Sequence, residues 1–326
     1  MTARRALLAA LLLVGATVTA CGGSSSPKGN EVVFPTVVTL GKGDIFPAIN
    51  NQVLAVGDNR VSMSLTDRND NPVLGAQVHL RFYDLNGPKP ALRSESDARF
   101  IPMTLAYVDE QSGKQEQQSG DAGVYVTHAT FDEPGNWGVQ VTVVRDGTSP
   151  PPVPFRFNVL AHAPEPAIGD PAPASRQATL ATVPSIEDID SSYPPRPQMH
   201  DTTVADALTS GKPIVVAFAT PAFCQSRTCA PVMDTVMDPL YAKYKDRAAF
   251  IHIEPYELPQ LRQSNVDEPV RAMREWNLQT EPWVFVVGRD GRVAGKFEGI
   301  MAVDEVESVL VQALGGTPTV TPSPTS

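Results

Sequence analysis

The chain has 326 residues, 42% of them hydrophobic, and a formal net charge of −10 at pH 7. This length favours two domains, because a single core seldom serves a chain so long. The excess of acidic residues argues against a nucleic-acid partner, since phosphate binding needs a basic face. After the N-terminal segment no run approaches the roughly eighteen apolar residues of a membrane span, so we expect the remainder to be soluble.

Residues 1–20 have the pattern of an export signal. Arg4 and Arg5 supply the positive end, and residues 6–18 form an apolar run too short for a lasting membrane anchor. Small residues then lead directly to Cys21. This arrangement resembles the lipobox of bacterial lipoproteins, whose cysteine is acylated, for example with palmitate, after the signal peptide is cleaved.

The resemblance implies lipidation at Cys21. The mature protein would then be anchored to the cell membrane on its extracytoplasmic face without spanning it. The alternative is an ordinary signal peptide cut before Gly22. Residues 21–31 read as a flexible tether because they are rich in glycine and serine.

Residues 32–161 carry several segments that alternate apolar and polar residues, which predicts half-buried strands. Many short strands without a convincing helix favour an all-β antiparallel sandwich. Residues 57–82 and 121–143 resemble the immunoglobulin-like domains of bacterial surface proteins, most of all the YtkA-like group. The resemblance implies a domain that binds or spaces other molecules. The alternating residues that share a face are Val61, Met63 and Leu65; Val78, Leu80 and Phe82; Trp137, Val139, Val141 and Val143; and Phe155, Phe157 and Val159.

Two possible metal motifs in this region are discounted. Residues 67–78 begin like a calcium-binding loop, but Pro72 replaces the required glycine and Val78 the bidentate glutamate, so a turn is the better interpretation. His128 has no second histidine close in sequence with which to form a metal pair. We therefore expect neither a metal nor another cofactor here.

Residues 162–198 are dense in proline, alanine and serine, which predicts a semi-stiff linker. Part of this linker could instead lie along a domain surface. Residues 315–326 are predicted to form a disordered tail.

Residues 199–314 show a different pattern, in which helices and strands alternate in the order αβαβαββα. Asp201 is the expected cap of the first helix. Continuous apolar runs predict buried central strands, and apolar residues at helical spacing predict amphipathic helices. The predicted elements are a helix over 201–208, a strand over 213–219, a helix over 232–244, a strand over 248–254, a helix over 270–276, strands over 283–287 and 292–298, and a helix over 303–314.

Cys224 and Cys229 lie where the first of these strands gives way to a helix. Unpaired amides at a helix start favour a thiolate. With Pro282 just before the third strand, this pattern resembles the thioredoxin-fold superfamily. The resemblance implies an α/β fold and thiol–disulfide exchange with extracytoplasmic proteins that carry thiols or disulfides. Cys224 would be the attacking thiolate, Cys229 the resolving thiol, and Pro282 a cis-proline that docks the substrate.

The pair departs from the family in three respects. Four residues separate the cysteines instead of two, Phe223 stands where a tryptophan is usual, and the preceding strand contains no acid. In an oxidising compartment the pair is expected to form a disulfide. A purely structural bridge in a binding protein is therefore an alternative, although so short a loop would stabilise the fold by only about 2 kcal/mol.

Two further alternatives remain. Residues 220–229 are similar to thiol peroxidases of the peroxiredoxin Q type, but Pro282 stands where those enzymes place an arginine. Cys229, Met233 and Met237 share a helical face and suit Cu(I), although core packing is the simpler role for the methionines.

Two further pairs of side chains are candidates for a role. His252 and Glu254 share a face of the second predicted strand, where we expect them to solvate a strand end. Trp276 and Trp283 flank the proline segment and could shape a substrate groove, although core packing is the more usual role.

Overall fold

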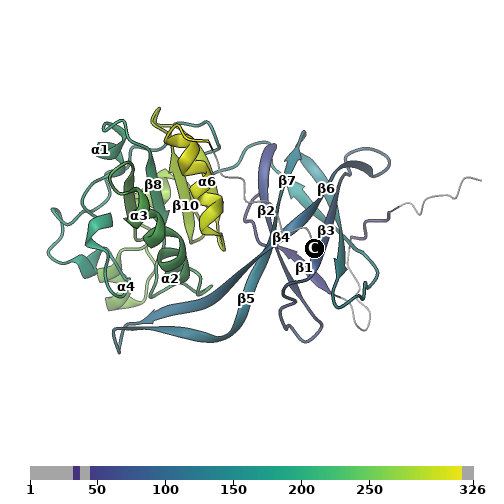
Figure 1. Cartoon of the computed structure of the whole chain (residues 1–326), viewed down its shortest axis with the longest axis horizontal. Helices are drawn as coiled ribbons and strands as arrows, with labels where there is room; N and C mark the ends of the chain where they lie inside the picture. The colour runs from purple at the N-terminus through teal and green to yellow at the C-terminus, as the bar shows by residue number, and fades with distance from the viewer. Residues whose placement is uncertain (1–31, 37–44, 318–326) are drawn as a thin grey trace, which may run out of the picture. The chain divides into compact units, whose positions relative to one another are not determined.

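A computed structural model describes residues 32–36 and 45–317 (Figure 1). The predicted signal peptide, the tether with Cys21 and most of the predicted tail therefore lie outside the described residues. Val33–Ser326 form one compact unit by their contacts, and the division at residue 162 stays a prediction. Among the described helices, none is both long and apolar enough to cross a membrane.

The first half of the described chain is all β. Its strands form an antiparallel seven-stranded sheet in the order β1-β2-β5-β4-β3-β6-β7. β4 changes partner along its length: residues 91–98 pair with β3, and residues 99–109 pair with β5. The strands are β1 (Phe46–Ile49), β2 (Gly57–Thr66), β3 (Gln77–Asp84), β4 (Ala91–Asp109), β5 (Lys114–Phe131), β6 (Gly135–Val144) and β7 (Val153–Val159).

Alternating side chains of these strands build one apolar core. The inward residues of β2 and β5 meet those of β3 and β6, with Phe131 packing edge-on against Trp137 at 4.8 Å between ring centroids. The predicted alternation is confirmed in β2, where Val61, Met63 and Leu65 are buried. These contacts establish a β-sheet core, while the immunoglobulin-like assignment stays a prediction.

The loop after β2 is a turn, as interpreted from the sequence. The Asp67 carboxylate accepts hydrogen bonds from the backbone N–H groups of Asn69 and Asn71 at 2.8 and 3.0 Å. Asp70 adopts a left-handed conformation with φ of 61°, which asparagine and aspartate tolerate well in turns. The carboxylate is thus used to close the turn.

The remaining elements form a mixed four-stranded sheet with helices. The strand order is β11-β10-β8-β9, with β8 parallel to β9 and β10 antiparallel to β8 and β11. The predicted order of helices and strands is confirmed, with one additional helix, α4. The elements are α1 (Val204–Leu208), β8 (Ile214–Phe218), α2 (Cys229–Val232), η3 (Met233–Met237), α3 (Asp238–Tyr244), β9 (Ala249–Ile253), α4 (Leu258–Ser264), α5 (Arg271–Glu275), β10 (Trp283–Val287), β11 (Val293–Glu298) and α6 (Val303–Ala313).

The central strand β8 is apolar because both of its faces are covered. Val215 and Ala217 belong to a core shared with α2, α3 and α6. Val216 belongs to a second core on the other face, which also buries Trp276 and Trp283. The core-packing interpretation of the two tryptophans is therefore confirmed. Thr203 caps α1 by accepting from the Asp206 amide, so the expected cap at Asp201 is wrong.

The helix that follows the cysteines is locally wide. Between α2 and α3 the stretch η3 is π-helical. Pro239 lies just beyond it, and a proline without an N–H cannot donate to the carbonyl four residues earlier. Met233 and Met237 are fully buried here, which confirms their interpretation as core residues.

Residues 162–198 are packed onto the fold. Val293 of β11 donates its amide to the Asp170 carbonyl at 2.9 Å, and Ala172 joins the core below β8. Further along, η1 (Ile186–Asp188) and η2 (Pro197–Met199) are short 3-10 turns. The segment therefore lies along the surface of the fold and does not form a free linker.

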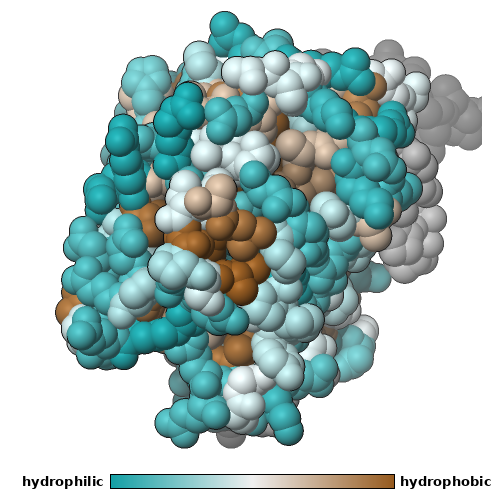
Figure 2. All heavy atoms as spheres, turned by 90° about the vertical axis from the view of Figure 1, so that its left-hand side faces the viewer, coloured by the Kyte–Doolittle hydropathy of each residue, from teal (hydrophilic) through white to brown (hydrophobic). Residues whose placement is uncertain are grey.

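The face drawn in Figure 2 carries an apolar patch within a mostly hydrophilic surface.

The β4–β5 hairpin extends beyond the other strands toward α2 (Figure 1). Ala106 donates its amide to the Arg227 carbonyl at 3.0 Å, and Val108 donates to the Pro221 carbonyl at 3.2 Å. One edge of the hairpin is thus hydrogen-bonded to the loop that carries Cys224.

Candidate functional site

The two cysteines lie at the end of β8, as the sequence predicts. The loop after β8 folds back on itself, so that the Cys224 amide donates to the Thr220 carbonyl at 2.9 Å. Arg227 then takes a left-handed conformation with φ of 60° and lets the chain enter α2 at Cys229. Cys224 is 3% exposed and Cys229 is completely buried.

Hydrogen bonds converge on the sulfur of Cys224. It accepts from the Cys229 amide at 3.3 Å and lies 3.1 Å from the Ser226 hydroxyl. That hydroxyl is itself 2.7 Å from the Thr228 hydroxyl. Hydrogen-bond donors that converge on a sulfur in this way stabilise a thiolate, as the amides at the start of a helix also do.

The two thiols consequently differ in acidity. A hydrogen bond from the Cys229 thiol, together with those from Ser226 and the helix amides, lowers the pKa of Cys224 to about 6. Burial and the neighbouring Cys224 sulfur raise the pKa of Cys229 well above its usual value. Both cysteines are free in the structure. At neutral pH the pair consists of a thiolate and a buried thiol.

A carboxylate that the sequence analysis missed lies next to this pair. Glu281 precedes Pro282, and the peptide bond between them is cis, as the resemblance implied. Burial, and to a lesser extent the Cys224 charge, raise the pKa of Glu281, and the Tyr256 hydroxyl donates to its carboxylate at 2.9 Å. Its position directly before the proline is the one feature of the sequence that could have pointed to Glu281. The strand before the cysteines, β8, contains no acid that could take such a role.

Side chains of the β4–β5 hairpin border the cysteine loop. The Arg227 guanidinium lies 3.7 Å from the centroid of the Tyr107 ring. Arg262 of α4 binds Glu110 of the hairpin, with nitrogen–oxygen distances of 2.5 and 2.9 Å. Arg227, Tyr107, Glu110 and Cys224 border a common cavity together with Phe223, and the Arg262 guanidinium lies 5.8 Å from the centroid of the Phe223 ring. No local sequence pattern predicts this contact, since the hairpin is more than a hundred residues away from the cysteine loop.

The expectation for His252 and Glu254 is wrong. They do not solvate a strand end: their side chains are 0% and 3% exposed. Burial raises the pKa of Glu254 well above its usual value. Ser191, from the segment before η2, donates to Glu254 at 2.7 Å and accepts from the Ala222 amide at 3.1 Å. The segment 162–198 covers this strand end, which composition alone could not reveal.

The structure bears on two of the alternatives. For copper, Met233 and Met237 are fully buried and pack with Cys229 in one apolar core, as core packing of the methionines requires. For a thiol peroxidase, the position of the expected arginine is the cis-proline. The structure also places Glu281, which precedes Pro282, close enough to both cysteines to interact with their charges.

No protein-family model and no curated protein matches this chain. Several solved structures show partial likeness. A putative thiol:disulfide interchange protein DsbE from Chlorobium tepidum is 18% identical over 46% of this chain and 99% of its own, with a TM-score of 0.33. A thioredoxin-family thiol:disulfide interchange protein from Chlorobium tepidum TLS is 20% identical, with the same coverages and a TM-score of 0.30. MtrC from Shewanella baltica OS185 is 14% identical over 36% of this chain and 22% of its own, with a TM-score of 0.23. Likenesses at such scores do not define what this chain does.

Proposed function

We propose that this protein is a thioredoxin-like thiol–disulfide exchange protein. The observation that carries the proposal is the unequal acidity of the pair: Cys224 has a pKa of about 6, whereas Cys229 is fully buried with a raised pKa. A structural bridge needs no such difference. An exchange reaction does, because one sulfur must attack as a thiolate while the other waits as a thiol.

The reaction would proceed in two displacements. The Cys224 thiolate attacks one sulfur of a substrate disulfide, forms a mixed disulfide and releases the other substrate sulfur as a thiolate. Cys229 then loses its proton and attacks the Cys224 sulfur, which frees the second substrate thiolate. The protein's dithiol is oxidised by two electrons and the substrate is reduced to two thiols. The reverse sequence would oxidise a substrate dithiol.

The proposal includes a location and a class of partner. The pattern around Cys21 supports cleavage and acylation of that residue, which would hold the protein on the extracytoplasmic face of the cell membrane. Its partners would then be exported proteins with thiols or disulfides. The seven-stranded region, proposed to be immunoglobulin-like, would lie between the lipid tether and the redox site. Mass spectrometry of the mature N-terminus should find acyl groups on Cys21, whereas a free amine at Gly22 would rule them out.

A redox titration tests the exchange reaction. The protein is equilibrated in mixtures of reduced and oxidised glutathione, and the free thiols are alkylated and counted by mass spectrometry. A reduction potential above about −300 mV is expected for an active pair. The variant Cys229→Ser should hold glutathione as a stable mixed disulfide on Cys224, which wild type should release.

The matched control is Cys224→Ser, which keeps the buried thiol and removes the attacking one. It should form no adduct. A potential well below about −300 mV, with no adduct on Cys229→Ser, would instead support a structural disulfide in a non-catalytic binding protein.

A further inference from the structure

A second group of polar side chains is buried beside the cysteine loop. Asp190 comes from the segment before η2, His200 follows η2, and His252 lies on β9. All three side chains are 0 or 1% exposed. One ligand-type atom from each lies within 4.8 Å of the other two. Two parts of the chain, the stretch from Asp190 to His200 and the strand β9, therefore bring two imidazoles and a carboxylate to one point.

The hydrogen bonding of His252 leaves one ring nitrogen free. Its Nε2 lies 2.9 Å from the Ala219 carbonyl oxygen, so Nε2 carries the proton and donates it. In the neutral ring Nδ1 is then an acceptor, because a neutral imidazole has one donor and one acceptor nitrogen. Nδ1 has no hydrogen-bond partner and faces the Asp190 carboxylate at 3.6 Å. Two acceptors facing each other in a dry site repel unless a cation lies between them.

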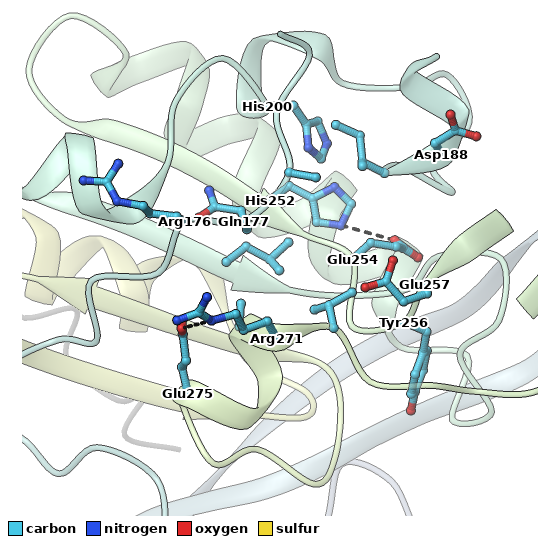
Figure 3. A pocket seen from close by; sticks show the side chains of 15 residues that line it. Arg176, Gln177, Asp188, His200, His252, Glu254, Tyr256, Glu257, Arg271 and Glu275 are labelled. Carbon is cyan, nitrogen blue, oxygen red and sulfur yellow. Dashed lines mark hydrogen bonds and ion pairs between the residues drawn. The ribbon is translucent and has the colours of Figure 1, made fainter. Parts of the chain in front are cut away.

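His200 also has a buried ring nitrogen without a hydrogen-bond partner. Its Nε2 is buried without a hydrogen bond, although it lies only 3.3 Å from the other Asp190 oxygen. The rings of His200 and His252 lie next to each other, with centroids 5.0 Å apart (Figure 3). A buried polar atom without a hydrogen-bond partner destabilises the folded state. A metal ion would bind both nitrogens and the carboxylate at once.

We propose that Asp190, His200 and His252 bind one divalent transition-metal ion of the zinc type. Ligand atoms about 2.0–2.2 Å from a tetrahedral Zn²⁺ lie about 3.4 Å apart. Each imidazole nitrogen is at a similar distance from one oxygen of the Asp190 carboxylate, His200 Nε2 at 3.3 Å from Oδ2 and His252 Nδ1 at 3.6 Å from Oδ1. Since all three ligand atoms lie within 4.8 Å of one another, the widest pair would have to approach by about 1.4 Å at most. Two imidazoles and a carboxylate are a donor set that suits Zn²⁺ and its neighbours in the series.

The surroundings support the ligands. Asp190 is oriented by the backbone amides of Ser192 and Arg196, at 2.8 and 2.6 Å. The Nε2–H of His252 donates to a backbone carbonyl, as metal-bound histidines commonly do. A cavity of about 210 Å³ borders both histidines, which provides an entry path and space for a water as fourth ligand.

The site would join two parts of the chain. Asp190 and His200 belong to the covering segment, and His252 belongs to the sheet. The Ala219 carbonyl that holds His252 begins the loop that leads to Cys224. A bound ion would therefore fasten the covering segment to β9 behind the cysteine loop. This role does not depend on the exchange reaction.

The experiment uses the full chain with Cys224→Ser and Cys229→Ser, because free thiolates would also bind zinc. Co²⁺ is titrated into this cysteine-free protein, since tetrahedral Co²⁺ absorbs visible light. One Co²⁺ per chain is expected, without a sulfur charge-transfer band, and Zn²⁺ should displace it. The absence of visible absorption, together with no Zn²⁺ retained after desalting, would overturn the proposal. An ion pair between a protonated His200 and Asp190 would give that result.

Variants locate the bound ion. Asp190→Asn, His200→Gln and His252→Gln in the cysteine-free protein should each weaken Co²⁺ binding by on the order of 100-fold. The control His128→Gln removes an exposed histidine that also lies near a carboxylate, at 3.2 Å from Asp58, and should not weaken binding. Circular dichroism verifies that each variant is folded. Unchanged affinity in a folded cluster variant would overturn the site, and if all three unfold, the titration of the cysteine-free parent decides.

Discussion

At the residue scale, the chemistry rests on how two identical side chains are made different. Cys224 lies before α2 and accepts a hydrogen bond from the first amide of the helix, whereas Cys229 is the first residue of α2 and is buried among apolar neighbours. Donors lower a thiol pKa and burial raises it. The four residues between the cysteines include Ser226, whose hydroxyl lies 3.1 Å from Cys224. The wide spacing thus provides an additional donor.

Replacing Ser226 with alanine should raise the pKa of Cys224. Loss of one hydroxyl that donates to a thiolate should raise the thiol pKa by about half a unit to one unit. The pH dependence of thiolate absorbance in the reduced protein measures the change. Gln225→Ala is the matched control, because Gln225 is exposed in the same loop. An unchanged pKa in Ser226→Ala would mean that the helix amides and Cys229 alone stabilise the thiolate.

Glu281→Gln addresses proton removal from Cys229. The raised pKa of Glu281, due mainly to burial, makes its carboxylate a stronger base than an exposed one. If it takes the Cys229 proton, the variant should resolve a mixed disulfide on the order of tenfold more slowly. If its charge only disfavours the Cys229 thiolate, the variant should resolve it faster. Stopped-flow release of glutathione separates the two, with the exposed Glu257→Gln as control.

At the element scale, sequence patterns predicted the helices and strands whose structure depends on residues close together in the chain. β8 was predictable because a strand covered on both faces is apolar throughout, and the helix over 232–244 because its apolar residues recur at helical spacing. β4 was not predicted. Much of it, such as residues 91–99, is polar on both faces and carries no alternation signal. Its position across the cysteine loop depends on backbone hydrogen bonds between distant segments, which leave no trace in composition.

The same limit applies to the candidate site. Cys224, Cys229 and Pro282 could be identified because their order along the chain is distinctive. Glu281 was overlooked because an acid was expected in the strand before the cysteines. The burial of His252 arises from the segment 162–198, whose proline content predicted a spacer. Proline excludes a regular ladder but does not prevent a segment from packing.

The β4–β5 hairpin should limit access to Cys224. Ala106 pairs with Gln117 across the hairpin, so an Asn-Gly turn joining these residues would shorten it without changing the register. Cys224 is 3% exposed in the intact protein, and the shortened variant should react with neutral iodoacetamide on the order of tenfold faster. The alkylation rates of the two proteins are compared at a pH at which Cys224 is fully ionised in both. Lys114→Ala, an exposed change in the intact hairpin, should have no effect.

An unchanged alkylation rate in the shortened variant would mean that the cysteine loop itself buries Cys224. The expected acceleration would mean instead that the hairpin restricts which substrates reach the thiolate. In that case the all-β region contributes to the specificity of the redox site, in addition to any role as a spacer.

At the scale of the whole molecule, the two sheets are joined by polar contacts whose strength should depend on pH. Arg60 of β2 binds Glu305 of α6 at 2.8 Å. Nearby, the Glu298 carboxylate of β11 accepts from the Gln52 amide at 3.1 and 3.2 Å and from the Thr280 hydroxyl at 3.0 Å. Glu298 is the titratable group here, because burial raises its pKa to about 7.

Glu298 should therefore stabilise the fold in acid and lose that effect as the pH rises. An unfolded glutamate titrates near pH 4.5, so between that pH and about 7 the folded state binds the proton that the unfolded state has lost. Stability contributed by this group is complete below pH 4.5 and disappears as the pH passes 7. The change amounts to about 2 kcal/mol in the free energy of unfolding between pH 5 and pH 8.

Urea unfolding at the two pH values, for wild type and Glu298→Gln, measures this contribution. All other titrating groups are common to both proteins. Between pH 5 and pH 8 the free energy of unfolding should therefore fall by about 2 kcal/mol more in the wild type than in the variant. Glu257→Gln, an exposed change, should behave like wild type. An equal loss in wild type and Glu298→Gln would place the carboxylate in an ordinary solvated environment. The expected difference would instead show that ionising the buried Glu298 carboxyl destabilises the folded protein.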